Sequence, residues 1–321
     1  MLRYFTNRLL ALLPKILLIT AIIFIGLELL PGDIVTRSVA PEELINLTDA
    51  DIERLREAKG LNDPAVVRYF RWLGDLTKGN FGYSLASGSA ISTVLATSLP
   101  ATIELAIFGL ILSTIFGISL GFLSAVKQNT LIDHASSVVG MVGISVPEFF
   151  FGMLFILIFS INLQWLPTGG RVSQSDPSLL GHLKHMVLPA TCLGISLTAT
   201  LMRYTRNSML DVMNKDYIKT ARAKGSSEFS VYVKHCFRNG CAPVMMLLIS
   251  RLGFLVSGTT IIETVFNYPG MGSLLLSSIT TKDVPVAMTI LLMISLTVLI
   301  TCFIADLLLA FLDPRVRFGK E

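Results

Sequence analysis

Six apolar blocks dominate the sequence and limit what the chain can fold into. They cover residues 9–30, 105–126, 135–163, 186–202, 242–262 and 286–305. A helix needs ~20 predominantly apolar residues to cross the hydrocarbon core of a bilayer, and the blocks are close to this length. The last five blocks together contain only two charged residues, Glu148 and Arg251. We therefore predict an all-α integral membrane protein with six transmembrane helices.

The composition agrees with a membrane protein. Hydrophobic residues make up 52% of the chain and charged residues 15%, whereas soluble domains carry about 25% charged residues. This shortfall excludes an ordinary soluble enzyme. It also excludes a disordered chain, which needs high charge and few apolar residues. The residues outside the blocks form loops and ends, so we expect no large soluble domain.

The basic residues are concentrated on one side of the predicted membrane. Lys15, which precedes the uncharged part of the first block, counts with the segments before the first block, between the second and third, between the fourth and fifth, and after the sixth. Together they hold 15 lysines and arginines. The two short loops of the other side hold three, Arg171, Lys184 and Lys282. Because cytoplasmic loops are enriched in Lys and Arg, this pattern places both the N and the C terminus in the cytoplasm. No nucleic-acid partner is needed to explain the basic balance.

The blocks divide the chain into four parts. Residues 1–31 form an N-terminal transmembrane helix, which we interpret as a retained anchor because no small-x-small signal-cleavage site follows it. Residues 32–98 form an extracytoplasmic helical loop. Residues 99–315 form the transmembrane core, which includes a cytoplasmic loop at 203–241. Residues 316–321 form a cytoplasmic tail.

Three features predict local structure within these parts. Asp63 and Pro64 resemble a helix N-cap and first residue, and apolar residues at helical spacing follow them, so the long loop should contain an amphipathic helix. Pro147 lies inside the third block and should bend its helix. Small residues recur every four positions from Gly109 to Gly121, which should let the second helix pack closely against another.

Glu148 and Arg251 need an explanation inside the membrane. An isolated charge at the bilayer centre costs at least ~2.5–3.5 kcal/mol, so such residues face the interior and find partners. Counted along straight helices, Glu148 lies ~18 Å and Arg251 ~14 Å from the cytoplasmic side. We infer that they form an interior ion pair or line a pathway; the alternative is that water or a partner subunit satisfies each separately. Glu104 and Asp306 lie near block ends, where solvation costs little, and are assigned no role.

The cytoplasmic loop at 203–241 has a regular pattern. It carries eight basic residues, and apolar or small residues recur at near-helical spacing from Val212 to Ala223. Gly225 interrupts this pattern, and Ser226 to Phe229 restarts it. The pattern predicts two short helices joined at a glycine turn. A solvated basic loop that only sets topology does not explain the small residues beside the turn, whereas a helix that inserts into a groove on another protein does.

This loop resembles the coupling ("EAA") loop of ABC-importer permeases, in the form found in the dipeptide/oligopeptide/nickel permease family. The similar residues run from Asp216 to Gly225 and continue with His235, Arg238-Asn239 and Pro243. Ala221 and Gly225 match the general pattern of such loops. Lys219 and Thr220 stand where its acid and first alanine would fall, and Arg238 stands where many permeases have proline. These departures look typical of the peptide branch.

Other short motifs are similar to the same family over nearly the full length. In chain order they are Leu29-Leu30-Pro31-Gly32-Asp33, Phe81-Gly82-Tyr83-Ser84, Ser145-Val146-Pro147-Glu148-Phe149, Trp165-Leu166-Pro167, His185-Met186-Val187-Leu188-Pro189, Glu263-Thr264-Val265-Phe266, Pro269-Gly270-Met271-Gly272 and Leu312-Asp313-Pro314-Arg315. Each is weak by itself, and their order on matching spans gives the resemblance its weight.

The resemblance implies the transmembrane domain of a type I ABC importer in the bacterial plasma (inner) membrane. Such a permease subunit has no catalytic residues, cofactor or metal, and nothing in this sequence fits the phosphate loop G-x-x-x-x-G-K-[ST]. The implied partners are a second permease in a heterodimer, two ABC ATPase subunits, an extracytoplasmic solute-binding protein and membrane lipid. The residues that would couple to the ATPases are Asp216, Ala221, Arg222, Ala223 and Gly225.

A turn after the fifth block is a candidate outer gate. Pro269-Gly270 is a turn signal, and a turn there could re-enter toward the outer mouth. The candidate gate residues are Glu263, Pro269, Gly270 and Gly272. The alternative, an ordinary surface turn, fits the sequence equally well.

The imported solute stays open at this stage. The resembling family handles di- and oligopeptides, nickel or metal chelates, opines and glutathione, and we expect peptides. Two other classes of protein are less consistent with the sequence. A self-sufficient secondary transporter would show inverted repeats or broken helices in matching halves, and an intramembrane enzyme would show a motif such as H-E-x-x-H or G-x-S-x-G. We find neither. Cys236, Cys241 and His235 are too few ligands for a zinc site.

Overall fold

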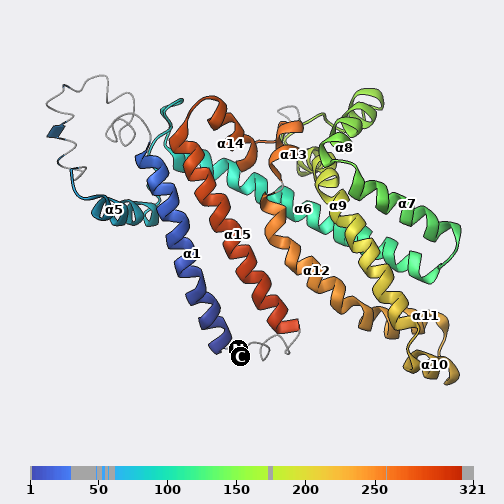
Figure 1. The fold of residues 1–321 in the computed structure, drawn as a ribbon. Coiled ribbons are helices and arrows are strands. Elements are labelled where there is room, and N and C mark those ends of the chain that lie inside the picture. The colour runs from blue at the N-terminus through green and yellow to red at the C-terminus, as the bar shows by residue number, and fades with distance from the viewer. Residues whose placement is uncertain are drawn as a thin grey trace. The chain divides into compact units, whose positions relative to one another are not determined.

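The structure, a computed structural model, describes residues 2–29, 48, 53–54, 57, 62–172, 176–257 and 259–312 (Figure 1). Within these ranges the regular structure is helical apart from an isolated bridge between Tyr83 and Ala90, which confirms the predicted all-α class. The chain divides into two compact units. One contains residues 1–102 and 269–300, and the other contains residues 103–268 and 301–321.

In the first unit, an amphipathic helix lies against the N-terminal helix. Helix α1 spans Leu2–Glu28 and α5 spans Ala65–Thr77. Thr20 of α1 hydrogen-bonds the Tyr69 hydroxyl of α5 at 2.7 Å, and Arg68 pairs with Glu28 at 2.8 Å. Phe24 adds aromatic contacts to Tyr69 and Trp72. The predicted helix in the long loop is therefore present, and it is fixed to α1 by polar and aromatic contacts.

The start of α5 differs from the prediction by one position. Pro64, not Asp63, occupies the N-cap, and its ψ of 145° is outside the helical range. The Asp63 carboxylate instead accepts a hydrogen bond from Arg71 at 2.7 Å. An aspartate caps a helix by accepting from the first free N–H groups. The Asp63 carboxylate forms an ion pair with Arg71 and does not cap α5. At the other end, Gly79 takes a left-handed φ of +78° and stops the helix.

The remaining helices of this unit pack around a small core. Helix α6, Ile91–Val126, begins in it, and α14, Met271–Thr280, and α15, Val284–Leu312, complete it. The core residues are Ile91, Leu95, Met271, Val286 and Ile290. Asp283, buried between α14 and α15, accepts from the Ser84 hydroxyl and from the Leu85 backbone N–H. One carboxylate thus holds the 83–90 turn against the α14–α15 junction.

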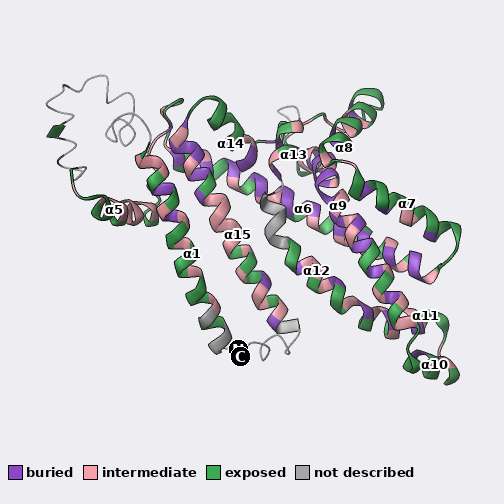
Figure 2. Ribbon diagram, in the orientation of Figure 1, coloured by how far each residue is buried: buried purple, intermediate pink, exposed green. Residues whose placement is uncertain are grey.

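The second unit is built around a long helix, α9, Leu179–Met213. The other helices of this unit pack beside it or follow from it, and buried residues concentrate along α9 (Figure 2). The helices around α9 are α7, Leu131–Ser145; α8, Glu148–Phe155; the π-helical segment η1, Ile156–Asn162; α10, Asp216–Ala223; α11, Glu228–Ser230; the π-helical segment η2, Val231–Phe237; α12, Arg238–Ser257; and α13, Thr259–Val265.

The bend predicted at Pro147 is present and large. Helix α7 and the helix formed by α8 and η1 meet at 105°. Val146, just before the proline, has an extended backbone with φ −91° and ψ 132°, as expected because the proline ring excludes the helical conformation from its predecessor. Glu148 is the first residue of α8 and follows the bend directly, so its predicted depth was counted along α7 and stays a prediction.

Among the residues that the structure describes, four helices are long and apolar enough to cross a membrane: α1 from Arg8, α6, α9 and α15 as far as Ala310. The bent pair of α7 with α8 and η1 makes a fifth if it is one span. The fifth apolar block forms α12 and α13. Several helices extend beyond their apolar blocks. Helix α6 starts at Ile91 and α9 at Leu179, before the blocks that begin at residues 105 and 186. Hydropathy marks only the lipid-facing part of such helices, not their polar extensions.

The small-residue face of α6 meets α9 closely, as predicted. A Cβ built on Gly117 would lie 2.7 Å from Leu201 Cβ and 2.9 Å from the Thr198 carbonyl oxygen. A Cβ on Gly121 would lie 2.6 Å from Thr205 Cβ. Both positions are tighter than van der Waals contact allows, so the glycines set the spacing between the two helices.

Gly117→Ala should therefore destabilise the protein. Overpacking a close contact costs about 1–3 kcal/mol, which offsets the gain of about 1 kcal/mol in helix propensity. Gly74→Ala on α5 is the matched control, because nothing lies within 4 Å of its Cβ position. Unfolding in detergent, followed by helical circular dichroism, should show a lower midpoint for Gly117→Ala only. Equal midpoints for the two variants would show that the α6–α9 contact is loose.

Candidate functional site

A short two-helix module follows α9 and carries the residues predicted to couple to a partner. Helix α10 ends at Lys224, and Gly225 turns the chain with a left-handed φ of +82°. The Ser226 N–H closes the turn on the Ala221 carbonyl at 3.2 Å. Ser227 then caps α11 by accepting from the Ser230 N–H. The predicted arrangement of two helices at a glycine turn is confirmed.

The module shares a core with the transmembrane helices. Ile218 of α10 is fully buried with Ala125 of α6, Met209 of α9, and Val231 and Cys236 of η2. Adjacent residues point about 100° apart around a helix, so the burial of Ile218 turns its neighbours outward. This shared core joins α10 to the ends of α6 and α9.

Arg222 of α10 links the two helices of the module through Glu228 of α11. Its Nε and Nη2 atoms donate to the two Glu228 carboxylate oxygens at 2.8 and 3.1 Å, and its guanidinium lies 6.0 Å from the centre of the Tyr232 ring. These hydrogen bonds lower the pKa of Glu228 below its usual value. The stabilisation from this pair is therefore present at neutral pH and is lost as the pH falls through the lowered pKa. Arg222 ties α10 to α11 across the Gly225 turn.

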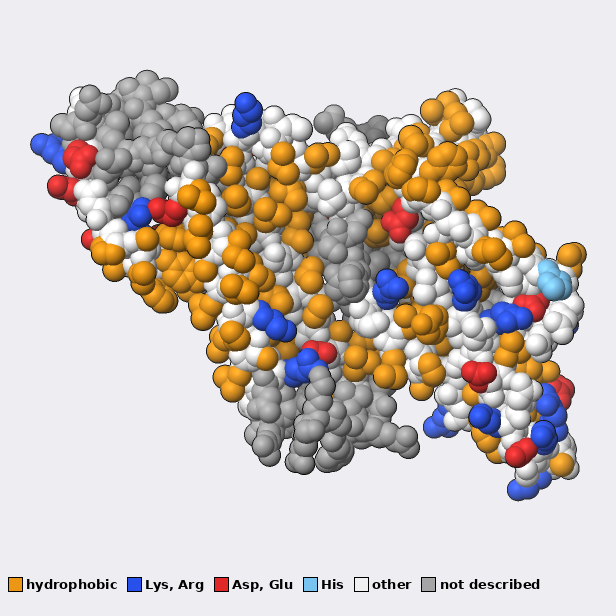
Figure 3. Space-filling model, viewed as in Figure 1, with side chains coloured by type: hydrophobic (Ala, Val, Ile, Leu, Met, Phe, Trp, Pro, Cys, Tyr) orange, Lys and Arg blue, Asp and Glu red, His pale blue; other side chains and the backbone are white. Residues whose placement is uncertain are grey.

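The outer face of the module is exposed and partly apolar. Asp216, Ala223 and Gly225, which we predicted as coupling residues, are exposed, whereas Ala221 is half-buried. Two aromatic side chains also project from the module, Tyr217 at 46% and Phe229 at 78% exposure. On the face shown in Figure 3, charged side chains gather around α10 and α11. The sequence analysis gave these two aromatics no separate role, and their exposure in the structure shows that they face outward.

A buried ion pair fixes the α6–α7 turn to α9 near this module. Arg206 of α9 donates to both Asp133 carboxylate oxygens, at 2.6 and 2.8 Å. The Ser124 hydroxyl donates to the same carboxylate at 2.6 Å and the Asn129 N–H at 3.0 Å. The Asp133 side chain is 3% exposed. Sequence reasoning gave no role to this pair, because its members lie 73 residues apart.

A second polar cluster surrounds Glu104 of α6. Its Oε2 accepts from Arg171 at 2.7 Å, and its Oε1 accepts from the Tyr268 hydroxyl at 3.0 Å. The His182 ring of α9 contacts Oε1 through Nε2. We had assigned Glu104 no role because it lies near the start of its apolar block. That interpretation is wrong, since α6 begins well before Glu104 and the carboxylate has three side-chain partners.

Glu148 and Arg251 both belong to the second unit. Glu148 is the first residue of α8 and is half-buried, and Arg251 of α12 is exposed. The ion pairs found among the described side chains do not include one between these two residues. A pathway role or a pair in another conformation stays a prediction.

The candidate gate residues are divided between the units. Glu263 lies in α13 of the second unit and is fully buried. Pro269, Gly270 and Gly272 belong to the first unit, where Gly270 occupies the N-cap of α14. Gly270 and Gly272 are buried and Pro269 is exposed. This burial disfavours the ordinary surface turn that we kept as the alternative, and a gate role stays a prediction.

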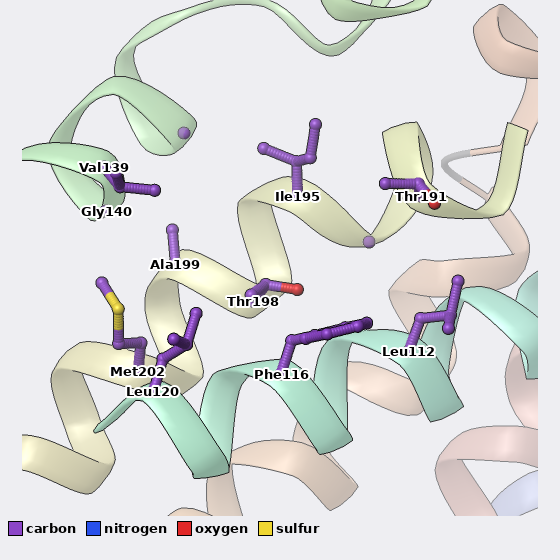
Figure 4. Close-up of a pocket in the computed structure, with 12 residues that line it drawn as sticks. Leu112, Phe116, Leu120, Val139, Gly140, Thr191, Ile195, Thr198, Ala199 and Met202 are labelled. Carbon is purple, nitrogen blue, oxygen red and sulfur yellow. The ribbon is translucent and has the colours of Figure 1, made fainter. Parts of the chain in front are cut away.

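The second unit also contains an apolar pocket of about 320 Å³ between α6, α7 and α9. Phe116, Val139, Ile195 and Met202 are among the side chains that line it (Figure 4). Hydroxyls are rare in the lining, with Thr191 and Thr198 as examples. The pocket offers no charged group that could orient a polar ligand.

Comparison with known proteins identifies the family. A family profile described as "Binding-protein-dependent transport system inner membrane component" matches residues 117–318. The chain belongs to this family. The match includes the two-helix module, so the resemblance seen in residues 216–243 is confirmed. The protein is thus an inner-membrane permease component of an ABC importer.

Curated relatives match this permease over almost its whole length. It is 41% identical to a putative peptide permease protein of Brucella suis biovar 1 (strain 1330), with 99% of both chains covered. It is 36% identical to the oligopeptide transport system permease protein AppB of Bacillus subtilis (strain 168), over 98% of this chain and 99% of AppB. It is also 36% identical to the glutathione transport system permease protein GsiC of Escherichia coli (strain K12), over 99% and 100% of the two chains.

A solved structure has a similar fold. One chain of the inward-facing MetNI methionine ABC transporter aligns with a TM-score of 0.54 and 15% identity. The alignment covers 68% of the permease and 96% of that chain. At this identity the likeness shows the fold alone, which is that of a type I ABC-importer permease.

The Asp133–Arg206 pair gives a stability prediction. Asp133→Ala should cost up to about 3–5 kcal/mol, because it leaves a partly buried guanidinium without its counter-charge. Asp63→Ala removes a carboxylate from the exposed Arg71 pair, where both side chains are more than 40% exposed, and should cost less than about 1 kcal/mol. Denaturant unfolding in detergent distinguishes the two. A loss as small for Asp133 as for Asp63 would contradict a stabilising role for the buried pair.

Proposed function

We propose that this permease forms the translocation pathway for peptides and is driven by two ABC ATPase subunits that dock on α10 and α11. The observation that carries the proposal is the module itself. It presents an exposed face with Tyr217, Ala223 and Phe229, while Ile218 joins it to the ends of α6 and α9. Aromatic side chains on an exposed helix face are typical anchors for a partner protein.

The chain's composition supports a division of labour between subunits. Nothing in the sequence fits a phosphate-binding loop, so ATP binding and hydrolysis would belong to the partners. Closure of the ATPases would push α10, and the core around Ile218 would pass this movement to α6 and α9. Asp216, Ala223 and Gly225 would touch the ATPase, whereas Ala221 and Arg222 would hold the module in shape.

The proposed topology has six spans with both termini in the cytoplasm. It counts α7 with α8 and η1 as one broken span and α12 with α13 as another, in addition to α1, α6, α9 and α15. The sided distribution of Lys and Arg supports this orientation, and it places α10 and α11 on the cytoplasmic side. A second permease and an extracytoplasmic binding protein complete the proposed assembly.

The proposed solute is a peptide. The relatives with 36–41% identity are named for peptides, oligopeptides and glutathione, which is itself a small peptide. Glutathione, opines, nickel and nickel chelates are the competing solutes. Uptake by vesicles that contain the full complex, with each solute offered together with its binding protein, would decide between them.

One measurement distinguishes a permease from a self-sufficient transporter. The complex with its co-encoded ATPases should show vanadate-sensitive ATP hydrolysis that a solute-loaded binding protein stimulates. Solute uptake by vesicles that contain this chain alone would contradict the proposal, because no energy source would then be coupled to it.

Docking on the module gives a mutational prediction. Ala223→Arg should weaken association with the ATPase subunits at least about tenfold, because a long charged side chain would occupy the close contact. Ala86→Arg is the matched control, since Ala86 is also an exposed alanine and lies in the 83–90 turn. Co-purification of the ATPases should be lost for Ala223→Arg alone. Equal recovery with both variants would show that α10 is not the docking surface.

Glu148 and Arg251 give a second functional prediction. If they pair during transport, Glu148→Arg and Arg251→Glu should each abolish uptake, and the double variant should restore it, because the two charges are exchanged but kept together. ATPase co-purification serves as the folding control. Failure of the double variant to recover uptake would count against direct pairing.

A further inference from the structure

The His182 ring lies between two oxygen acceptors. Its Nδ1 is 3.1 Å from the Arg171 carbonyl oxygen, and its Nε2 contacts Glu104 Oε1. A carbonyl oxygen can only accept, so Nδ1 must carry a hydrogen. The contact between Nε2 and the carboxylate needs a hydrogen of its own, either on the imidazole or on Glu104. The arrangement therefore requires one proton more than neutral His182 and ionised Glu104 hold.

The neighbouring groups do not supply this proton. Arg171 uses its Nη2 to donate to Glu104 Oε2 at 2.7 Å, and the Tyr268 hydroxyl donates to Oε1 at 3.0 Å. With the extra proton the group of Glu104, Arg171, His182 and Tyr268 has a net charge of +1. Without it, one ring nitrogen presents a lone pair to an oxygen acceptor, either Nδ1 to the Arg171 carbonyl or Nε2 to the Glu104 carboxylate, and that contact becomes repulsive.

Other titratable groups on the same elements do not replace His182. The charges that act on the Glu104 carboxylate are those of Arg171 and His182. His185, one turn further along α9, places Nδ1 2.8 Å from the Gly169 carbonyl oxygen, which its neutral form satisfies. Asp176 is held by Ser178, and the nearby charges that act on it are those of Lys184 and His185. Glu148 and Glu263 lie on α8 and α13, and neither is among the groups that act on the Glu104 carboxylate.

These contacts hold two separate chain segments together. Arg171 and the Gly169 carbonyl belong to the connection between η1 and α9, and Tyr268 follows α13. The Gly170 N–H donates to the Phe266 carbonyl at 2.8 Å, and Gly169 packs directly on the Phe266 backbone. The connection therefore lies on the segment that leads to Tyr268, and Glu104 and His182 fasten both to α6 and α9.

We propose that Glu104, Arg171, His182 and Tyr268 form a proton-binding site that keeps residues 166–172 fastened to residues 263–268 while the extra proton is bound. The side chains of Glu104, Arg171 and His182 are 24%, 31% and 20% exposed, so water can deliver and remove the proton. Loss of the proton releases the connection. The effect on transport rests on the proposed function, whereas proton binding does not.

The sign of the pH effect follows from linkage. Protons bind the fastened form, so acid favours it and rising pH favours release. One proton can shift this equilibrium by at most about tenfold per pH unit.

Hydrogen exchange on the purified transporter in lipid nanodiscs tests the site directly. After correction for the intrinsic effect of pH, amide protection in residues 166–172 should fall up to tenfold per unit as the pH rises. His182→Gln keeps a donor toward Glu104 but does not titrate, so its protection should not depend on pH. His185→Gln removes the contact to the Gly169 carbonyl and should lower protection at every pH, but it should keep the pH dependence of the wild type. Protection that is independent of pH in the wild type, or equally dependent on it in His182→Gln, would overturn the proposal.

Uptake tests whether the site acts in the transport cycle. With the binding protein in excess, wild type and His185→Gln should share a pH profile between pH 5 and 8 that His182→Gln lacks. Identical profiles for all three would overturn a role in transport, even if hydrogen exchange showed pH-dependent protection of residues 166–172. Absence of binding-protein-stimulated ATP hydrolysis at every pH would contradict the proposed function instead, and the exchange result would still decide whether the proton site exists.

Discussion

The close contact between α6 and α9 is the interaction on which the second unit depends. In lipid, helices gain little from hydrophobic burial against each other, so association relies on close packing and on polar contacts between them. Gly117 and Gly121 bring the α6 backbone against α9. At this separation the Asp133 carboxylate can accept from both Ser124 of α6 and Arg206 of α9, and the Glu104 carboxylate can meet His182. Wider spacing would leave these groups without partners.

Helix α9 links the two polar clusters. His182 lies in its first turn and Arg206 near its last, 24 residues further on, which corresponds to about 36 Å along a straight helix. The coupling module begins at Asp216, directly after this helix. A movement of the module would therefore act on a rod whose far end carries the His182 contact. In the proposed function, this continuity would carry a movement of the module to the other end of α9.

The sequence predicted features that depend on local chemistry. Periodicity and a single glycine located both helices of the coupling module, and Pro147 located the break in the third block, because each acts on its nearest neighbours. The Glu104 contacts were not predictable in this way, since Tyr268 and His182 lie 164 and 78 residues away. Likewise, hydropathy could not show that α6 begins at Ile91, because a helix continues into polar sequence when tertiary contacts satisfy it.

The break at Pro147 constrains the surroundings of this chain. Where α7 ends and α8 begins, backbone groups leave the regular hydrogen-bond pattern, and hydrocarbon cannot satisfy them. Irregular backbone at membrane depth is tolerated only where protein covers it or water reaches it. Yet the residues around the break, including Ile144, Phe149 and Phe150, are exposed in the single chain. If a bilayer surrounds the kink, these backbone groups require a neighbouring chain or water beside them rather than lipid.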